Sequence, residues 1–132
     1  MNIDIDKTIF QKYNVKLAYL FGSQAKGTPD KNSDFDIAVL FKNPSSPLAL
    51  KEIAGISQEL IKSFPSHIDI VSLNCASLLL KYEVVHNGKI LYCENETERI
   101  NFEVSVIKEY ADQEPIRKLY NEALHKKILQ RT

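Results

Sequence analysis

Four short runs of this chain have the length and the apolar content of β-strands. The first covers about 16–21 and is almost wholly apolar, whereas the runs over about 34–41 and 67–73 begin with alternating polar and apolar residues. A fourth covers about 89–92. Only a short polar stretch separates the first two runs, with no room for a long crossover helix. We therefore predict that these two strands are antiparallel neighbours.

Between and after these runs, apolar residues recur at the spacing of a helix. The expected helices cover about 4–13, 47–64, 74–87 (or 77–87), and from 95 or 97 onward. Ser46 is a suitable N-cap for the second helix, with Pro47 at its first position, and Thr97 for the fourth. Gly88 is expected to end the third helix in a left-handed conformation. Strands and helices in this order predict an α/β (α+β) fold, a small mixed sheet flanked by helices.

The C-terminal segment, about 95–132, carries two apolar stripes at helical spacing. The first comprises Ile100, Val104, Ile107 and Ala111, and Phe102 and Val106 lie off it. Pro115 interrupts the helical hydrogen bonds. The second stripe then comprises Ile116, Leu119, Tyr120, Ala123, Leu124 and Ile128. We favour the interpretation that this helical tail packs within the molecule. The alternative, compatible with the first, is that the tail contacts a helical partner protein.

Composition narrows the functional classes. Lys plus Arg and Asp plus Glu both number 17, which gives no general attraction for nucleic acid or anionic membranes. No apolar segment approaches the length of about 18 residues that reads as a membrane span, and the first residues show no secretory signal. Cys75 and Cys93 have neither the number nor the spacing of a disulfide framework or zinc site. We expect a single cytoplasmic domain over 1–132.

The sequence between the first two strands carries the residues of a phosphate-binding corner. At Gly22-Ser23 a missing Cβ lets backbone N–H groups approach an anion, and Ser23 to Lys26 can form a helical turn facing it. Asp34 and Asp36 share one face of the second strand, and adjacent carboxylates near a phosphate predict Mg²⁺. Each feature alone favours a plain turn or strand end. Their combination, ten residues apart and between two strands, favours metal-assisted phosphoryl chemistry.

A third carboxylate, Asp69, lies in the middle of the third apolar run. If that strand pairs with the second and turns its isoleucines into the core, Asp69 emerges on the face of Asp34 and Asp36. On its own, Asp69 would more often be a strand-end residue or half of an ion pair. Its interpretation as a metal ligand therefore depends on the other two aspartates. His67 lies two residues earlier on the same face. We favour its interpretation as a strand-end surface residue; the alternative is that it touches the site.

This combination resembles the signature of the polymerase-β-like nucleotidyltransferases. The matching residues are Gly22-Ser23, a ten-residue interval containing Ala25, Gly27 and Ser33, and then Asp34-x-Asp36. The order of helix, Asn-Gly and short strand after the third carboxylate is also similar. The short chain resembles the minimal branch of that superfamily (MNT), the MntA-type antitoxins of HEPN/MNT toxin–antitoxin pairs.

The resemblance implies a polymerase-β-like nucleotidyltransferase fold and an ATP-dependent nucleotidyl transfer. It implies that Asp34, Asp36 and Asp69 are catalytic and bind two Mg²⁺ ions. It also implies that the nucleotide is bound by Gly22, Ser23 and Lys26, where Lys26 keeps the positive charge of an arginine frequent in the family.

The implied partner is a HEPN-type ribonuclease toxin, which a type VII-like antitoxin neutralises by transferring AMP from ATP to one of its tyrosines. One alternative is a non-catalytic nucleotide-binding protein that silences a helical toxin by occlusion. Another is a small-molecule nucleotidyltransferase, although a chain of this length leaves little room for the walls of a small-molecule site. Neither a membrane nor direct contact with nucleic acid is expected.

Overall fold

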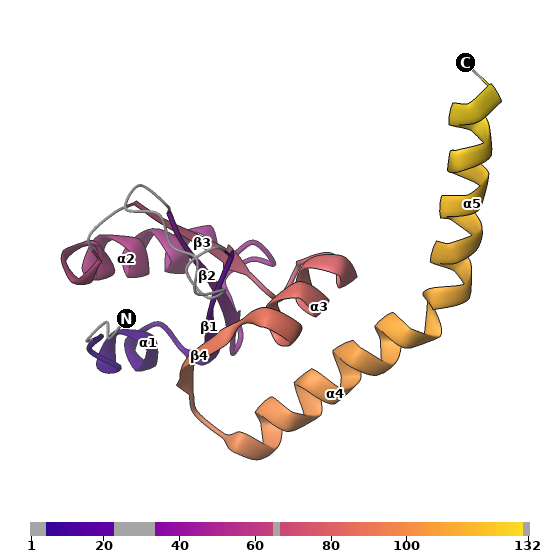
Figure 1. Cartoon of the computed structure of the whole chain (residues 1–132). Helices are drawn as coiled ribbons and strands as arrows, with labels where there is room; N and C mark the ends of the chain where they lie inside the picture. Colours follow the sequence, from indigo (N-terminus) through magenta and orange to yellow (C-terminus); the bar gives the residue numbers. More distant parts are fainter. Residues whose placement is uncertain (1–4, 23–33, 65–66, 131–132) are drawn as a thin grey trace.

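Four strands form one mixed sheet in the order β3-β2-β1-β4. The computed structural model describes residues 5–22, 34–64 and 67–130 (Figure 1). The strands are β1 (Val15–Phe21), β2 (Phe35–Phe41), β3 (Ile68–Ser72) and β4 (Lys89–Cys93). β1 lies antiparallel to both β2 and β4, and β3 lies parallel to β2 at one edge. The predicted α/β class, the mixed sheet and the antiparallel pairing of the first two strands are confirmed.

Two helices, α1 (Thr8–Lys12) and α2 (Leu50–Leu60), cover one face of the sheet, and the single turn η2 (Ile61–Ser63) follows α2 (Figure 1). Phe10 of α1 and Ile56 of α2 are fully buried there, in one cluster with Phe35 and Ile37 of β2. Successive strand residues point to opposite faces. Burying these two β2 residues therefore turns Asp36, which lies between them, to the other face.

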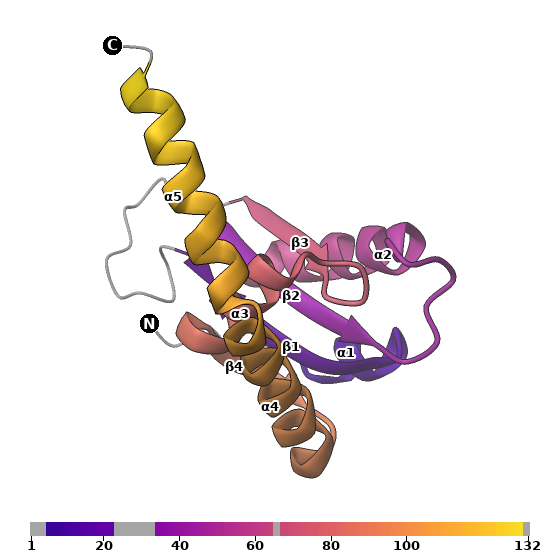
Figure 2. The same ribbon diagram turned by 90° about the vertical axis from the view of Figure 1, so that its right-hand side faces the viewer.

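The other face is covered by α3 (Leu78–Asn87) and α4 (Glu96–Asp112) (Figure 2). Val84 of α3 and Phe102 of α4 pack with Leu17 and Tyr19 of β1 in a second apolar cluster. This cluster does not extend over the first residues of β2 and β3 on this face. Asp36 is therefore only half-buried, and Asp69 is exposed to solvent. The open end of this face is therefore the place where polar chemistry can reach solvent.

The end of α3 corrects one prediction. Ser77 caps the start of this helix, accepting a hydrogen bond from the N–H of Leu80 at 3.2 Å, as one of the two expected starts requires. Gly88, however, has φ −74° and ψ 156°, which is extended and not left-handed. Its N–H donates to the carbonyl oxygen of Val84 at 2.7 Å, and a Cβ on Gly88 would collide with that oxygen. Glycine is needed here because the Val84 carbonyl oxygen lies where a Cβ would stand, and not because the backbone is left-handed.

The starts of α2 and α4 also differ from the expected ones. Ala49 adopts a left-handed conformation with φ 51°, and α2 begins after it rather than at Pro47. The Ser46 hydroxyl accepts a hydrogen bond from the N–H of Ala49 at 3.2 Å, so it stabilises the turn before the helix. Asn95, not Thr97, caps α4: its Oδ1 accepts a hydrogen bond from the N–H of Glu98 at 3.1 Å. At the N-terminus, α1 is shorter than expected.

The C-terminal helices correct the prediction about the tail. The side of α4 that faces the sheet carries Val106, which is 3% exposed, whereas Ile100 and Val104 of the predicted stripe are 50% and 57% exposed. The following helix, α5 (Glu114–Gln130), leaves the body of the protein, and none of its described side chains is buried (Figure 1). The favoured interpretation that this tail packs within the molecule is therefore wrong for α5. No helix in the described ranges is long and apolar enough to span a membrane.

Candidate active site

Parallel pairing of β2 and β3 brings two carboxylates together. Asp36 is the direct register partner of Asp69, and the flanking pairs are Phe35 with Ile68 and Ile37 with Ile70. Because residues paired across adjacent strands point to the same face, both carboxylates emerge on the face opposite α2. The predicted juxtaposition of Asp69 with the second strand is confirmed, and it follows from strand alternation.

Gly22 forms the corner beside Asp36. It directly follows Phe21, whose register partner across the antiparallel ladder is Asp36. Gly22 has φ +77°, a conformation that side chains with a Cβ rarely adopt. A Cβ at this position would also collide with Oδ2 of Asp36. Glycine is therefore required both by the backbone conformation and by the room that the carboxylate occupies.

The site concentrates negative charge. Partial burial raises the pKa of Asp36, and the charges of Asp69 and Asp34 raise it further. Carboxylates crowded in this way at an exposed strand end present only oxygen ligands. This donor set fits a hard divalent cation such as Mg²⁺, which commonly combines one or two carboxylates with phosphate oxygens of the substrate.

The other predicted site residues are less firmly placed. Asp34 stands directly before β2 and is exposed, close enough for its charge to act on Asp36. Within the part of the chain that the structure describes, no three His, Cys, Asp or Glu side chains are grouped closely enough to hold a metal ion. The sheet thus fixes the pair Asp36 and Asp69. Ser23 and Lys26 lie outside the described residues, and the roles of all six site residues stay predictions.

His67 contacts the third carboxylate. Its Nε2 lies 3.0 Å from Oδ1 of Asp69, and the two side chains are 69% and 53% exposed. The favoured interpretation of His67 as a surface residue holds for its exposure, and its contact with Asp69 agrees with the alternative that His67 touches the site. The spacing of two residues along one strand, which places both side chains on one face, is the signal that points to it.

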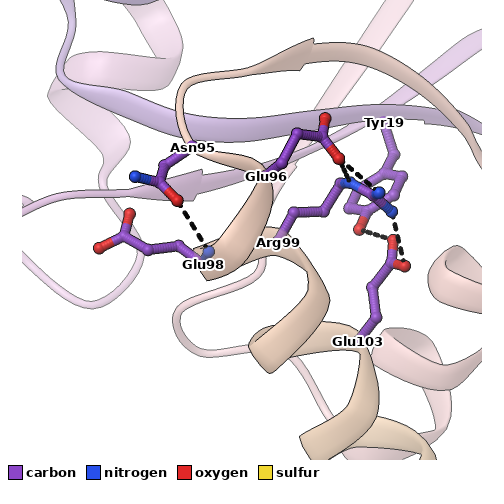
Figure 3. A network of polar contacts seen from close by, with 6 residues as sticks. All are labelled: Tyr19, Asn95, Glu96, Glu98, Arg99 and Glu103. Atoms are coloured by element: carbon purple, nitrogen blue, oxygen red, sulfur yellow. Dashed lines mark hydrogen bonds and ion pairs between the residues drawn. The ribbon is translucent and has the colours of Figure 1, made fainter.

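A polar network fixes α4 to the face of the sheet that carries the carboxylates (Figure 3). The Tyr19 hydroxyl donates to Oε2 of Glu103 at 2.5 Å, and Arg99 donates to Oε1 of Glu103 at 2.9 Å and to Glu96. Burial raises the pKa of Tyr19, and the hydrogen bond to Glu103 raises it further. This network explains why the fully apolar stripe of α4 is not its contact side: the buried phenol requires a polar partner.

The family can be assigned from the comparison with known proteins. The family model described as "Polymerase beta, Nucleotidyltransferase" matches residues 5–97, which include the whole sheet and every predicted site residue. The chain belongs to this family. The resemblance inferred from Gly22-Ser23 and the three aspartates is thereby confirmed, together with the predicted fold.

Individual relatives agree with this assignment. Protein adenylyltransferase MntA from Aphanizomenon flos-aquae is 39% identical, and the match covers 70% of this chain and 67% of that protein. A chain in the crystal structure of a toxin–antitoxin with AMP-PNP matches with a TM-score of 0.73 and 28% identity, over 92% of this chain and 99% of that chain. A chain from a complex of tri-AMPylated Shewanella oneidensis HEPN toxin with MNT antitoxin matches with a TM-score of 0.68 and 26% identity, over 89% of this chain and 91% of that chain.

Proposed function

We propose that this chain is a type VII-like antitoxin, a Mg²⁺-dependent protein adenylyltransferase that transfers AMP from ATP to a tyrosine of a cognate HEPN toxin. The observation that carries the proposal is the register pair of Asp36 and Asp69 beside the Gly22 corner. The relatives support the acceptor, because one is named a protein adenylyltransferase and another is bound to an AMPylated HEPN toxin.

Each site residue has a role in this proposal. Backbone N–H groups of Gly22 and Ser23 bind the triphosphate of ATP, and Lys26 adds a positive charge. Asp34 and Asp36 would hold the Mg²⁺ that accompanies the triphosphate, and all three aspartates would hold a second ion. When bound, the ions neutralise the charge that develops on the attacking and leaving oxygens.

The reaction is an in-line displacement at the α-phosphorus. The phenolic oxygen of the acceptor tyrosine forms a new bond to that phosphorus, the bond from phosphorus to the oxygen bridging the β-phosphate breaks, and pyrophosphate leaves. Asp69 accepts the phenolic proton. Its exposed position at the edge strand β3 gives a large acceptor direct access to it.

The openness of the site favours a protein acceptor over a small molecule. Small-molecule sites are usually concave and bury most of their ligand. Asp69 is exposed, and the two cavities described for this protein, between α3, α4 and α5 and beside Arg99, do not include Asp36 or Asp69. A folded protein can enclose its own tyrosine and the site between the two surfaces, so it suits an exposed sheet edge better than a small molecule does.

The test is to incubate the protein with ATP, Mg²⁺ and the cognate HEPN toxin, and to record intact and tryptic masses of that toxin. AMP on a tyrosine is the expected result. Inhibition of the HEPN ribonuclease without a change of mass would instead support occlusion, and would overturn the enzymatic proposal. Asp36→Asn serves as the inactive control, because it keeps the size of the side chain.

A further inference from the structure

The apolar side of α5 faces solvent. At 3.6 residues per turn, the apolar residues of its first two and a half turns follow one side of the helix. They form what we call the outer stripe: Ile116, Leu119, Tyr120, Ala123 and Leu124. Ile128 belongs to the stripe expected from the sequence but lies on the side of Arg117 and Asn121. Its larger members are between 44% and 70% exposed. Soluble monomers rarely leave a contiguous apolar surface of this kind uncovered.

The polar side of α5 faces the body of the protein. The guanidinium of Arg117 lies 3.6 Å from the ring centroid of Tyr110 and donates to the carbonyl oxygen of Tyr110 at 2.7 Å. Tyr110 stacks in turn on Tyr82 of α3, with ring centroids 3.7 Å apart. A cavity of about 810 Å³ between the three helices is lined on the α5 side by Glu114, Arg117, Lys118, Asn121, Glu122 and His125.

This orientation is the reverse of what an amphipathic helix does on its own core. The stack of Tyr82, Tyr110 and Arg117 ties the first turn of α5 to α3 and α4, and it holds the polar side inward. The outer stripe is consequently on the side of α5 that is turned away from the rest of the chain. No described residue outside α5 is known to cover this stripe, so we expect its partner to be another molecule.

We propose that the outer stripe is the docking surface for an amphipathic helix of the HEPN protein, an inference that rests on the proposed function. Apolar residues spaced by three and four along a helix are the anchors by which one helix recognises another. Lys127 lies on the same side of α5, one turn after Leu124, so the matching helix should carry an acidic residue at that level.

The comparison with solved structures supports this occupant. The match to the toxin–antitoxin structure covers 92% of this chain, which cannot be reached without part of the 17-residue α5. Part of α5 is therefore shared with a chain from a toxin–antitoxin crystal structure. A second copy of this chain is the competing occupant, and the experiment separates the two.

Docking on the outer stripe leaves the carboxylates free. α3 and α4 lie on the catalytic face of the sheet, and the outer stripe is on the far side of α5 from both. Loss of the stripe should therefore weaken the complex without slowing AMP transfer inside it. The expected kinetic effect is a raised KM for the HEPN protein with an unchanged kcat.

The experiment compares two double variants that each alter positions i and i+4 on exposed parts of α5. Ile116→Ser with Tyr120→Ser removes two large exposed members of the outer stripe, and Lys118→Ser with Glu122→Ser alters the side facing the cavity. The Kd for the HEPN protein is measured by calorimetry, and kcat and KM by AMP incorporation. The outer variant should bind about 10- to 100-fold more weakly, since truncated apolar and aromatic anchors typically cost that much. The control should bind within about threefold of the unmodified protein.

Each outcome decides the docking proposal. Equal affinity of both variants would overturn it, even if AMP transfer proceeds. A failure of the unmodified protein to bind the HEPN protein, or a homodimer in light scattering that the outer variant abolishes, would overturn it as well. Weaker binding of the outer variant alone supports it, and does so even if no AMP is transferred. In that case the proposed function fails while the docking surface stands.

Discussion

Two regions of the molecule are held in place differently: the end of the sheet that carries Asp36 and Asp69, called here the catalytic end, and α5, called here the C-terminal arm. At the catalytic end, Asp36 and Asp69 are fixed by strand register, with buried neighbours on both sides of Asp36 along the chain. In the arm, α5 is attached near its first turn through Arg117 and Tyr110, and its remaining described side chains are exposed. In the first region the sheet itself positions the side chains, and in the second an apolar side of a helix is exposed.

This difference separates two kinds of functional residue. A side chain placed by a sheet is positioned before any ligand arrives, which is what electrostatic stabilisation of a transition state requires. A side chain on an exposed helix is positioned by what binds it. Substitutions at the catalytic end should therefore affect the chemical step, and those on the arm should affect association.

The largest effect is expected for Asp36→Asn. The substitution removes a charge that would otherwise bind the divalent ions, and losing such a ligand costs several kcal/mol of transition-state stabilisation. AMP transfer, measured with radiolabelled ATP, should fall by at least about 1,000-fold. Thermal stability should be retained or slightly improved, because the charges of Asp69 and Asp34 no longer oppose a charge at this position.

A matched substitution sharpens this test. Asp112→Asn removes the same charge at the exposed end of α4, far along the chain from the site. It should leave the rate of AMP transfer unchanged. Transfer that survives Asp36→Asn, or falls equally in both variants, would contradict the assignment of the site.

The next effect in size is expected for Gly22→Ala. The new methyl group must displace the carboxylate of Asp36, and the φ of +77° becomes strained. We expect transfer to fall about 10- to 100-fold and the free energy of unfolding to drop by about 1–3 kcal/mol.

A double-mutant cycle identifies the cause. In an Asp36→Ala background the colliding oxygen is absent, so Gly22→Ala should cost measurably less stability there in urea titrations. An equal cost in both backgrounds would mean that backbone strain alone explains the loss, and that Gly22 makes no specific room for Asp36.

The catalytic end was predictable because its determinants are local. Alternation along β2 and β3 sets which face each aspartate occupies, and short connections limit how the strands can pair. The glycine with positive φ lies where the first strand ends. The contact of His67 with Asp69 follows from the same alternation.

The arm was not predictable to the same degree, because its determinants are tertiary. A stripe of apolar residues shows that a helix has an apolar side, but not what covers it. In α4 the side that faces the sheet is not the apolar stripe but the side that carries Glu103, because Glu103 accepts a hydrogen bond from the buried Tyr19 hydroxyl. In α5 the aromatic stack of Tyr82 and Tyr110 decided the orientation through Arg117, and no periodicity reports such a contact.

A smaller effect, on stability alone, is expected for Tyr19→Phe. The substitution removes the hydrogen bond to Glu103, which keeps its second partner Arg99. The free energy of unfolding should fall by about 1.5–3 kcal/mol, since hydrogen bonds to charged groups typically contribute this much. Tyr120→Phe is the matched control, as it deletes the same hydroxyl from an exposed ring and should leave the urea midpoint unchanged. A fall in kcat for Tyr19→Phe at full stability would show that the network acts on the chemical step.

The smallest effect is expected for His67→Ala. This substitution tests whether the catalytic site extends beyond the three aspartates. The ring of His67 contacts Asp69, but both side chains are more than half exposed. Water can replace a polar contact of this kind, and exposed pairs contribute about 0–1 kcal/mol. The rate of AMP transfer should therefore change less than about fivefold. A loss comparable to that expected for Asp36→Asn would place His67 among the catalytic residues. It would also show that the register of the sheet carries a fourth functional side chain to the site.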